Sequence, residues 1–286
     1  ANQEAPVTLA ADTKPFATEV ISDFDEPWAM TFLPDGKSAL VTEKKGKLML
    51  LTIGGQQREI GGVPKVDYGG QGGLGDVVLG PNFAEDGMVY LSWAEAGEGS
   101  TRGAVVGMAK LNLAGPSPTL EGLKTIWTQY PKVTGRGHYG HRLAFSPDGK
   151  YLFIASGDRQ KFDPAQDMNS NMGKILRLFP DGSIPEDNPF YVAGNTVKSQ
   201  IWSLGHRNPL GLTFDENGNL WNQEMGPAGG DEVNLVQRGA NYGYPKVSNG
   251  DHYDGTDIPD HSEGDSFAAP KAFWNPAISP GGLIYY

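Results

Sequence analysis

The chain has 286 residues, with 40 glycines, 21 prolines, 20% charged residues, no cysteine and a net charge of −11 at pH 7. The absence of cysteine excludes disulfides, thiolate zinc sites, iron–sulfur clusters and cysteine nucleophiles. The negative charge argues against nucleic acid or an anionic membrane surface as a partner, and no run of 18 apolar residues is present for membrane insertion.

The chain begins with the polar segment Ala1-Asn-Gln-Glu-Ala-Pro6 and has no initiator methionine. A start of this kind is typical of the mature end that remains after a signal peptide is removed. We therefore expect a periplasmic or secreted protein.

A unit of strand, turn, strand, loop and strand recurs four times along the chain. Its turns are rich in Pro, Asp, Asn and Gly, which are typical of turns between antiparallel strands. The turns recur at intervals of roughly 45 to 70 residues, as expected for propeller blades with insertions. The four turn segments are 32–36, 79–83, 145–149 and 214–218. A fifth unit is expected to begin at Ser279, and no helix of ordinary length is indicated. We predict a single all-β domain over 1–286, with a two-domain β-sandwich as the alternative.

A histidine pair lies in the glycine-rich loop Arg136-Gly-His138-Tyr-Gly-His141-Arg142, and Asp158 follows the next strand. A histidine titrates near neutral pH and is a natural proton acceptor, which an acid can orient. The plain alternative is a loop histidine with only structural hydrogen bonds. In a propeller, the loops between blades gather around one end of a central channel, and this would bring Gln71, His138, Asp158 and Arg207 together.

Three further loops carry polar groups that suit a ligand. Gln71 lies among five glycines, where its amide can hold a carbonyl or hydroxyl group. Arg207 and Asn208 stand in Gly-His-Arg-Asn-Pro, and Arg offers a planar fork for a carboxylate or quinone oxygen. The segment from Glu224 to Glu232 combines a Gly-Pro turn with carboxylates, the hard oxygen ligands that Ca²⁺ prefers. The structural alternatives are a flexible loop for Gln71, a strand-end ion pair for Arg207 and a hydrogen-bonded acidic turn for the segment from Glu224 to Glu232.

Read in order, these motifs resemble the soluble pyrroloquinoline quinone-dependent sugar dehydrogenases of the glucose/sorbosone dehydrogenase family, and most of all the bacterial aldose sugar dehydrogenases. The resemblance runs from about Pro27 to the C-terminus. It implies a six-bladed β-propeller of four-stranded antiparallel blades, of which the last one to two blades are missing from the sequence. It also implies further Lys and Arg residues, beyond this sequence, that pair with the cofactor carboxylates.

The same resemblance implies an activity and a role for each residue. The enzyme would oxidise the anomeric carbon of an aldose to a lactone, with pyrroloquinoline quinone (PQQ) and Ca²⁺ as cofactors and an external electron acceptor. His138 would be the general base, Asp158 would orient it, and Arg207 would stabilise the oxyanion formed after hydride transfer. The implied cofactor-binding residues are Gln71, Arg207 and Asn208. The implied metal-binding residues are Gly226 and Pro227, whose carbonyl oxygens would bind a Ca²⁺ that also holds the cofactor, and Glu232 and Tyr242, which match positions that bind a second, structural Ca²⁺.

Two departures from the family pattern leave other functions open: the missing last blades and the residues beside the predicted base. Tyr139 and His141 flank the predicted base where family members often have smaller residues, which makes the shape of the sugar pocket uncertain. A Ca²⁺-dependent lactonase on a similar propeller would use His138 to activate water, and a non-catalytic binding module would keep only the fold. A quinone spectrum that sugar bleaches distinguishes the dehydrogenase from both.

Overall fold

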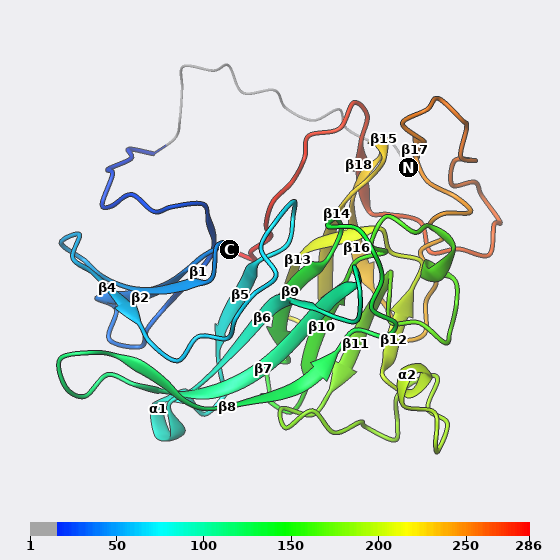
Figure 1. Cartoon of the computed structure of the whole chain (residues 1–286). Coiled ribbons are helices and arrows are strands. Elements are labelled where there is room, and N and C mark those ends of the chain that lie inside the picture. The colour runs from blue at the N-terminus through cyan, green and yellow to red at the C-terminus, as the bar shows by residue number, and fades with distance from the viewer. Residues whose placement is uncertain (1–15) are drawn as a thin grey trace.

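A computed structural model describes residues 16–286, which form a fan of four-stranded antiparallel sheets around a common axis (Figure 1). The segment 1–6, on which the prediction of export rests, lies outside the described residues. In each sheet the hydrogen-bonded neighbours follow one another along the chain, as in the blades of a propeller. The all-β prediction is confirmed.

The strand bounds of the four blades are as follows. Blade 1 consists of β1 (Pro27–Phe32), β2 (Ser38–Glu43), β3 (Lys47–Thr52) and β4 (Gln57–Ile60). Blade 2 consists of β5 (Leu74–Leu79), β6 (Met88–Ala96), β7 (Arg102–Asn112) and β8 (Thr119–Thr128). Blade 3 consists of β9 (Gly140–Phe145), β10 (Leu152–Ser156), β11 (Lys174–Leu178) and β12 (Ile201–Leu204). Blade 4 consists of β13 (Asn208–Phe214), β14 (Leu220–Met225), β16 (Asp231–Val236) and β18 (Ala272–Trp274).

The remaining elements are short. A two-stranded sheet pairs β15 (Ala228–Gly229) with β17 (Gly250–Asp251). The helical segments in the described chain are α1 (Phe83–Asp86), α2 (Thr196–Ser199) and the 3₁₀ turn η1 (Asp163–Ala165). The prediction that no helix of ordinary length exists is thus confirmed for residues 16–286, and none of their helices is long and apolar enough to cross a bilayer.

The predicted turns join the first two strands of each blade. In blade 1, Asp35 Oδ1 accepts the N–H groups of Lys37 and Ser38, and Gly36 takes the left-handed φ of +63° that the turn requires. Asp148 and Gly149, with φ of +71°, repeat this arrangement in blade 3. In these two turns the aspartate side chain therefore supplies the local hydrogen bonds that reverse the chain.

The hydrophobic core lies between neighbouring blades. The first strands β1, β5, β9 and β13 contact each other in that order and form the inner wall. Three apolar clusters then fill the spaces between blades 1 and 2, 2 and 3, and 3 and 4; Leu40 with Leu91, Leu143 with Tyr90, and Phe153 with Leu212 are examples. Face-to-face burial between blades thus leaves their connecting loops free to build a site at one end.

Two expectations differ from the structure. Residues 16–286 form four blades, not six, and the count of six remains a prediction. The segment 279–286 forms no strand, so the expected opening of a fifth unit is wrong for this structure. Its Leu283 and Tyr285 instead line a surface pocket together with Thr213, Trp221 and Val233 of blade 4.

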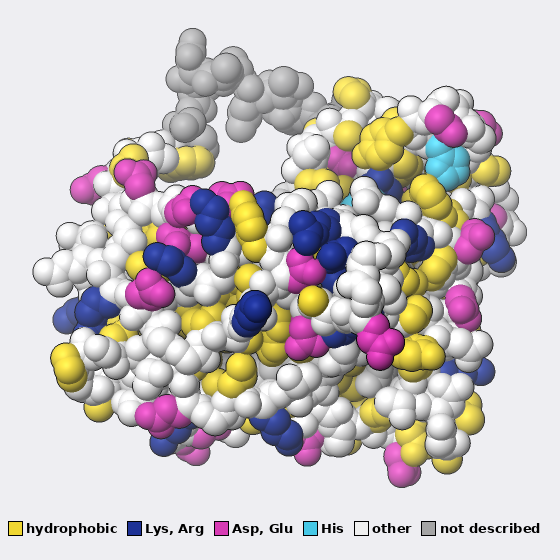
Figure 2. All heavy atoms as spheres, in the orientation of Figure 1, with side chains coloured by type: hydrophobic (Ala, Val, Ile, Leu, Met, Phe, Trp, Pro, Cys, Tyr) yellow, Lys and Arg dark blue, Asp and Glu magenta, His cyan; other side chains and the backbone are white. Residues whose placement is uncertain are grey.

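The face seen in Figure 2 carries acidic and basic side chains interspersed over the blades. No broad basic patch interrupts this visible face, in agreement with the net charge of −11. The distribution offers no footprint there of the kind that binds a phosphate backbone.

Candidate active site

The predicted residues from three inter-strand loops lie in one contact network. His138 precedes β9, Asp158 follows β10 and Arg207 precedes β13. The backbone N–H of Asp158 donates to the Arg207 carbonyl at 2.7 Å, and the backbone N–H of His138 donates to Gln71 Oε1 at 2.7 Å. The antiparallel meander places these loop ends at the same end of the propeller.

The predicted base and its orienting acid form a buried pair. His138 Nδ1 lies 2.6 Å from Asp158 Oδ1, and the two residues are 6% and 0% exposed. Asp158 also accepts the backbone N–H groups of Gln160 and Phe162, which hold its carboxylate in place. An ionised carboxylate only accepts hydrogen bonds, so a neutral imidazole beside one would carry its proton on Nδ1 and leave the Nε2 lone pair free.

The backbone at His138 is held in an uncommon conformation. Its φ is +48°, which residues other than glycine rarely adopt. Gly157 makes this possible, because a Cβ at that position would lie 2.1 Å from the His138 carbonyl oxygen. The glycine in Ser-Gly-Asp therefore allows the loop that carries His138 to pack closely against the end of β10.

Arg207 and Asn208 present polar atoms that lack partners. Arg207 Nη1 donates to the carbonyl oxygens of Met225 and Gly226 at 3.0 and 2.5 Å, while Nη2 lies 3.4 Å from the Tyr253 hydroxyl. Arg207 Nε and Asn208 Oδ1 are buried and find no hydrogen-bond partner among residues 16–286. Leaving such atoms unpaired costs about 1–3 kcal/mol each, so this pair suits a bound polar cofactor.

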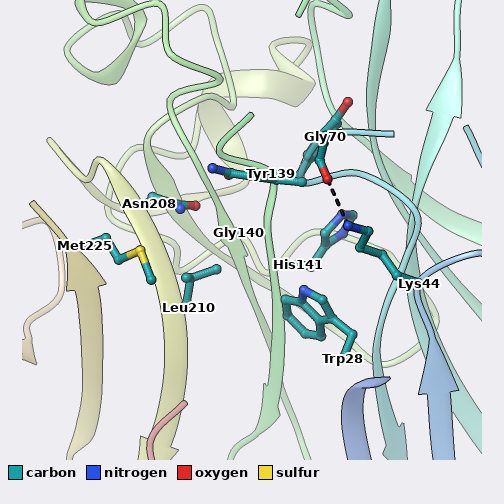
Figure 3. Close-up of a pocket in the computed structure, with 10 residues that line it drawn as sticks. Trp28, Lys44, Gly70, Tyr139, Gly140, His141, Asn208, Leu210 and Met225 are labelled. Atoms are coloured by element: carbon teal, nitrogen blue, oxygen red, sulfur yellow. Dashed lines mark hydrogen bonds between the residues drawn. The ribbon is translucent and has the colours of Figure 1, made fainter. Parts of the chain in front are cut away.

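A cavity of about 300 Å³ opens beside Asn208 (Figure 3). Lys44, His141 and Trp28 line one side, and Asn208 and Met225 face them across the cavity. Gln71 also borders it. The lining combines the apolar side chains of Trp28, Leu210 and Met225 with amide and amine groups, a mixture typical of sites for small polar molecules.

A second set of buried groups lies next to Arg207. His206 donates or accepts at both ring nitrogens, with Nδ1 at 2.8 Å from Glu224 Oε2 and Nε2 at 2.8 Å from Ser203 Oγ. Glu224 Oε1 accepts the backbone N–H of Arg207 at 3.0 Å. His206, which the sequence placed near the catalytic residues, therefore supports Arg207 through Glu224 and does not face the cavity.

The two buried glutamates differ in their protonation. Burial acts to raise the pKa of Glu224, but the charge and hydrogen bond of His206 outweigh it and hold the pKa below its usual value. Burial first, and the neighbouring charge of Glu224 second, raise the pKa of Glu232 to about 8. Among residues 16–286, only Asn234 donates to the Glu232 carboxylate, at 3.2 Å. A second hydrogen-bond donor or a bound cation would stabilise the ionised carboxylate of Glu232.

A small enclosed space of about 10 Å³ lies between the predicted metal ligands, large enough for one ion or water. It is bordered by Gly226, Pro227, Glu224, Glu232 and Tyr242. In the described part of the chain no three His, Asp or Glu side chains come together as a metal site, so backbone oxygens must complete any coordination shell. The residues present fit one hard cation such as Ca²⁺.

Two details limit which oxygens could bind this cation. The Gly226 carbonyl already accepts a hydrogen bond from Arg207 Nη1 and has one lone pair left. The Tyr242 hydroxyl donates to the Leu235 carbonyl, so its backbone carbonyl is the oxygen available to a metal. Sequence reasoning missed Glu224 as a central carboxylate, although it directly precedes the Met-Gly-Pro turn that drew attention.

The chain matches the family model described as glucose/sorbosone dehydrogenase over residues 24–286. It is 40% identical to an aldose sugar dehydrogenase, YliI, of Escherichia coli over 275 residues, which are 94% of this chain and 72% of that protein. The apo form of the soluble aldose sugar dehydrogenase from Escherichia coli superposes with a TM-score of 0.84 at 39% identity, covering 90% of this chain and 74% of that one.

A structure titled as the PQQ-bound form of an aldose sugar dehydrogenase from Streptomyces coelicolor superposes with a TM-score of 0.79 at 30% identity. It covers 93% of this chain and 74% of its own. The family match, the identities and the shared propeller agree with one another, and the chain belongs to the glucose/sorbosone dehydrogenase family.

Proposed function

We propose that this protein oxidises the anomeric carbon of an aldose to a lactone, with transfer of hydride to Ca²⁺-bound pyrroloquinoline quinone. The observation that carries the proposal is the buried His138–Asp158 pair at 2.6 Å. The next residues in its loop, Tyr139 and Gly140, line a cavity that Asn208, with its unpaired Oδ1, also borders. Family membership supports an oxidoreductase acting on sugars, and the PQQ-bound relative supports the cofactor.

The proton transfer falls to His138. The C1 hydroxyl of the sugar gives its proton to Nε2, and the C1–O bond becomes a carbonyl as the C1–H bond breaks and two electrons leave with the hydride. Asp158 stabilises the imidazolium that forms, because its buried carboxylate already accepts the Nδ1–H. The proton can then pass to solvent.

Gln71, Arg207 and Asn208 would hold the cofactor. Bound pyrroloquinoline quinone supplies an electrophilic carbonyl carbon that accepts the hydride. Arg207 Nε and Asn208 Oδ1 provide a cationic donor and an acceptor without partners of their own. Gln71 Oε1 is occupied by the His138 backbone, so its amide N–H groups are the ones that face a ligand. Arg207 would also stabilise the negative charge that develops on a cofactor oxygen.

Ca²⁺ would bind at the enclosed space beside Glu232, with the carbonyl oxygens of Gly226, Pro227 and Tyr242. The cation would ionise Glu232 and polarise an oxygen of a neighbouring ligand. The electrons would pass to an external acceptor.

The test is reconstitution of purified protein with PQQ and CaCl₂, followed by aldose-dependent reduction of a dye and by the quinone absorbance. We expect the absorbance to bleach on addition of sugar and lactone to form. Hydrolysis of lactones without quinone would favour a Ca²⁺-dependent lactonase. Quinone binding without sugar-dependent bleaching would refute the dehydrogenase.

A further inference from the structure

Arg159 is a buried arginine without a carboxylate partner in the described part of the chain. It is 1% exposed and forms no ion pair among residues 16–286. Its donors go to backbone carbonyls instead: Nε to Gly137 at 2.8 Å, Nη2 to Gly135 at 2.5 Å and Nη1 to Arg102 at 2.8 Å. Burying a cation is costly unless it is fully hydrogen-bonded, so this arrangement needs a structural or functional reason.

Two of these carbonyls belong to the loop that carries the predicted base. Gly135 and Gly137 precede His138, and the backbone N–H of Arg159 donates to the His138 carbonyl at 3.2 Å. The Arg159 guanidinium also lies 3.9 Å from the ring centre of Tyr139, the residue after the base. One side chain therefore contacts the base loop on both sides of His138.

A row of stacked rings extends this contact towards blade 1. Tyr139 stacks on His141 with centroids 5.2 Å apart and an interplanar angle of 14°, and the edge of His141 meets Trp28 at 5.8 Å. Burial first, and then the charges of Arg159 and Arg142, lower the pKa of His141 to about 3, so this ring stays neutral. A neutral ring adds no charge repulsion to the row, which links Arg159 to the inner strand β1.

The base loop needs such support because its backbone is strained. His138 has a φ of +48°, and a left-handed residue other than glycine persists only where its surroundings hold it firmly. Gln71 holds the His138 N–H, and Arg159 holds the His138 carbonyl and the carbonyls before it. The resulting orientation decides whether the imidazole can reach Asp158 on one side and a substrate hydroxyl on the other.

We propose that Arg159 is a positioning residue for the base: its guanidinium, clamped on the carbonyls of Gly135 and Gly137 and stacked on Tyr139, sets the orientation of His138. The inference rests on the proposed function only where turnover is measured. A purely structural arginine would stabilise the protein without controlling the geometry of the His138–Asp158 pair, and the two roles can be separated by experiment.

The matched control is Arg177, a second buried arginine, which lies over the rings of Tyr151 and Trp202 and contacts no residue of the base loop. Arg159→Met, Arg159→Lys and Arg177→Met are compared with the parent protein by thermal melting, by kcat and KM of the reconstituted enzyme, and by NMR of ¹⁵N-histidine-labelled protein. The downfield proton on His138 Nδ1 reports its hydrogen bond to Asp158 directly.

We expect both Met variants to melt at lower temperature, while only the Arg159 variants change the base. Arg159→Met should lower kcat about 10- to 100-fold with the sugar KM within about twofold, and should shift or broaden the Nδ1 proton signal. Arg159→Lys, which keeps the charge and loses the fork, should do the same to a smaller extent. Arg177→Met should keep both kcat and the signal.

An unchanged kcat and an unchanged Nδ1 signal in folded Arg159→Met would overturn the inference. If that variant does not fold, Arg159→Lys decides by the same readouts. If the parent protein oxidises no sugar, the proposed function fails and the NMR comparison alone decides: loss of the signal in the Arg159 variants, and not in Arg177→Met, supports the inference, and its retention refutes it.

Discussion

Glu232 allows a direct test of the cation site through the pH dependence of stability. In the metal-free protein its folded-state pKa is about 8, against 4.5 for an ordinary glutamate, because of burial and the neighbouring charge of Glu224. The native state then binds a proton that the unfolded state has released over this range. Its contribution to stability is therefore fully present below pH 4.5 and is lost as the pH rises towards 8 and beyond.

The magnitude follows from the two pKa values. A change from 4.5 to about 8 corresponds to about 5 kcal/mol of unfolding free energy between those pH values, as an upper bound. Glu232→Gln removes this titration, because an amide is neutral at every pH. In the presence of a chelator the variant should match the parent protein at pH 5 and exceed it by several kcal/mol at pH 9.

Calcium should reverse the order of stability of the parent protein and Glu232→Gln. Bound Ca²⁺ requires an ionised Glu232, so at pH 7 its binding should release about one proton and should stabilise the parent protein by mass action. The variant should lose most of this response. Urea unfolding at pH 5, 7 and 9, with chelator or with CaCl₂, measures both effects, and calorimetry in buffers of different ionisation enthalpy counts the protons. Glu59→Gln, an exposed ion-pair partner of Lys47, is the control.

Two results would refute this reasoning. One is a chelator-treated parent protein whose stability relative to Glu232→Gln does not change between pH 5 and pH 9, since Glu232 would then have an ordinary pKa. The other is an equal stabilisation of parent and variant by Ca²⁺, since the cation would then bind elsewhere. The Glu59 control should follow the parent protein in every condition.

Three further substitutions test the catalytic and cofactor-binding residues. His138→Ala should lower kcat about 10²-fold or more while quinone binding survives, and near-normal turnover in saturating cofactor contradicts its role as the base. Asp158→Asn should lower kcat about 10²- to 10⁴-fold, because the amide can impose the wrong tautomer on the imidazole; a kcat within threefold of the parent value argues against it. Arg207→Lys should weaken quinone binding about 10- to 100-fold in a fluorescence titration, since it loses the planar fork, and unchanged affinity removes Arg207 from the cofactor site.

The blades were predictable because their signals are local. An Asp-Gly turn such as Asp148-Gly149 supplies its own side-chain hydrogen bond and its own left-handed residue, so five consecutive residues specify the chain reversal. The shared end of the loops follows from the antiparallel meander, and this is why His138 and Asp158 could be paired from sequence.

The partners of buried polar groups were not predictable in this way. Arg159 follows Asp158 directly, yet its hydrogen bonds go to Gly135, Gly137 and Arg102 on other loops. The contact of His206 with Glu224 depends on the pairing of β13 with β14, which brings Glu224 opposite the start of β13. The segment 279–286 has a strand-like composition, but strand formation needs a hydrogen-bonded neighbour that the described chain does not provide.

Arg207 joins the two halves of the site and determines how the substitutions should be interpreted. Its carbonyl accepts the backbone N–H of Asp158 on the base side, its own N–H donates to Glu224 on the metal side, and its guanidinium donates to the Gly226 carbonyl. A change at the cation site can therefore move Gly226, then Arg207, and then the acid that orients His138. Substitution of Glu232 should consequently affect turnover as well as metal binding. Substitution of His138 should change only the base and should leave the calcium response intact.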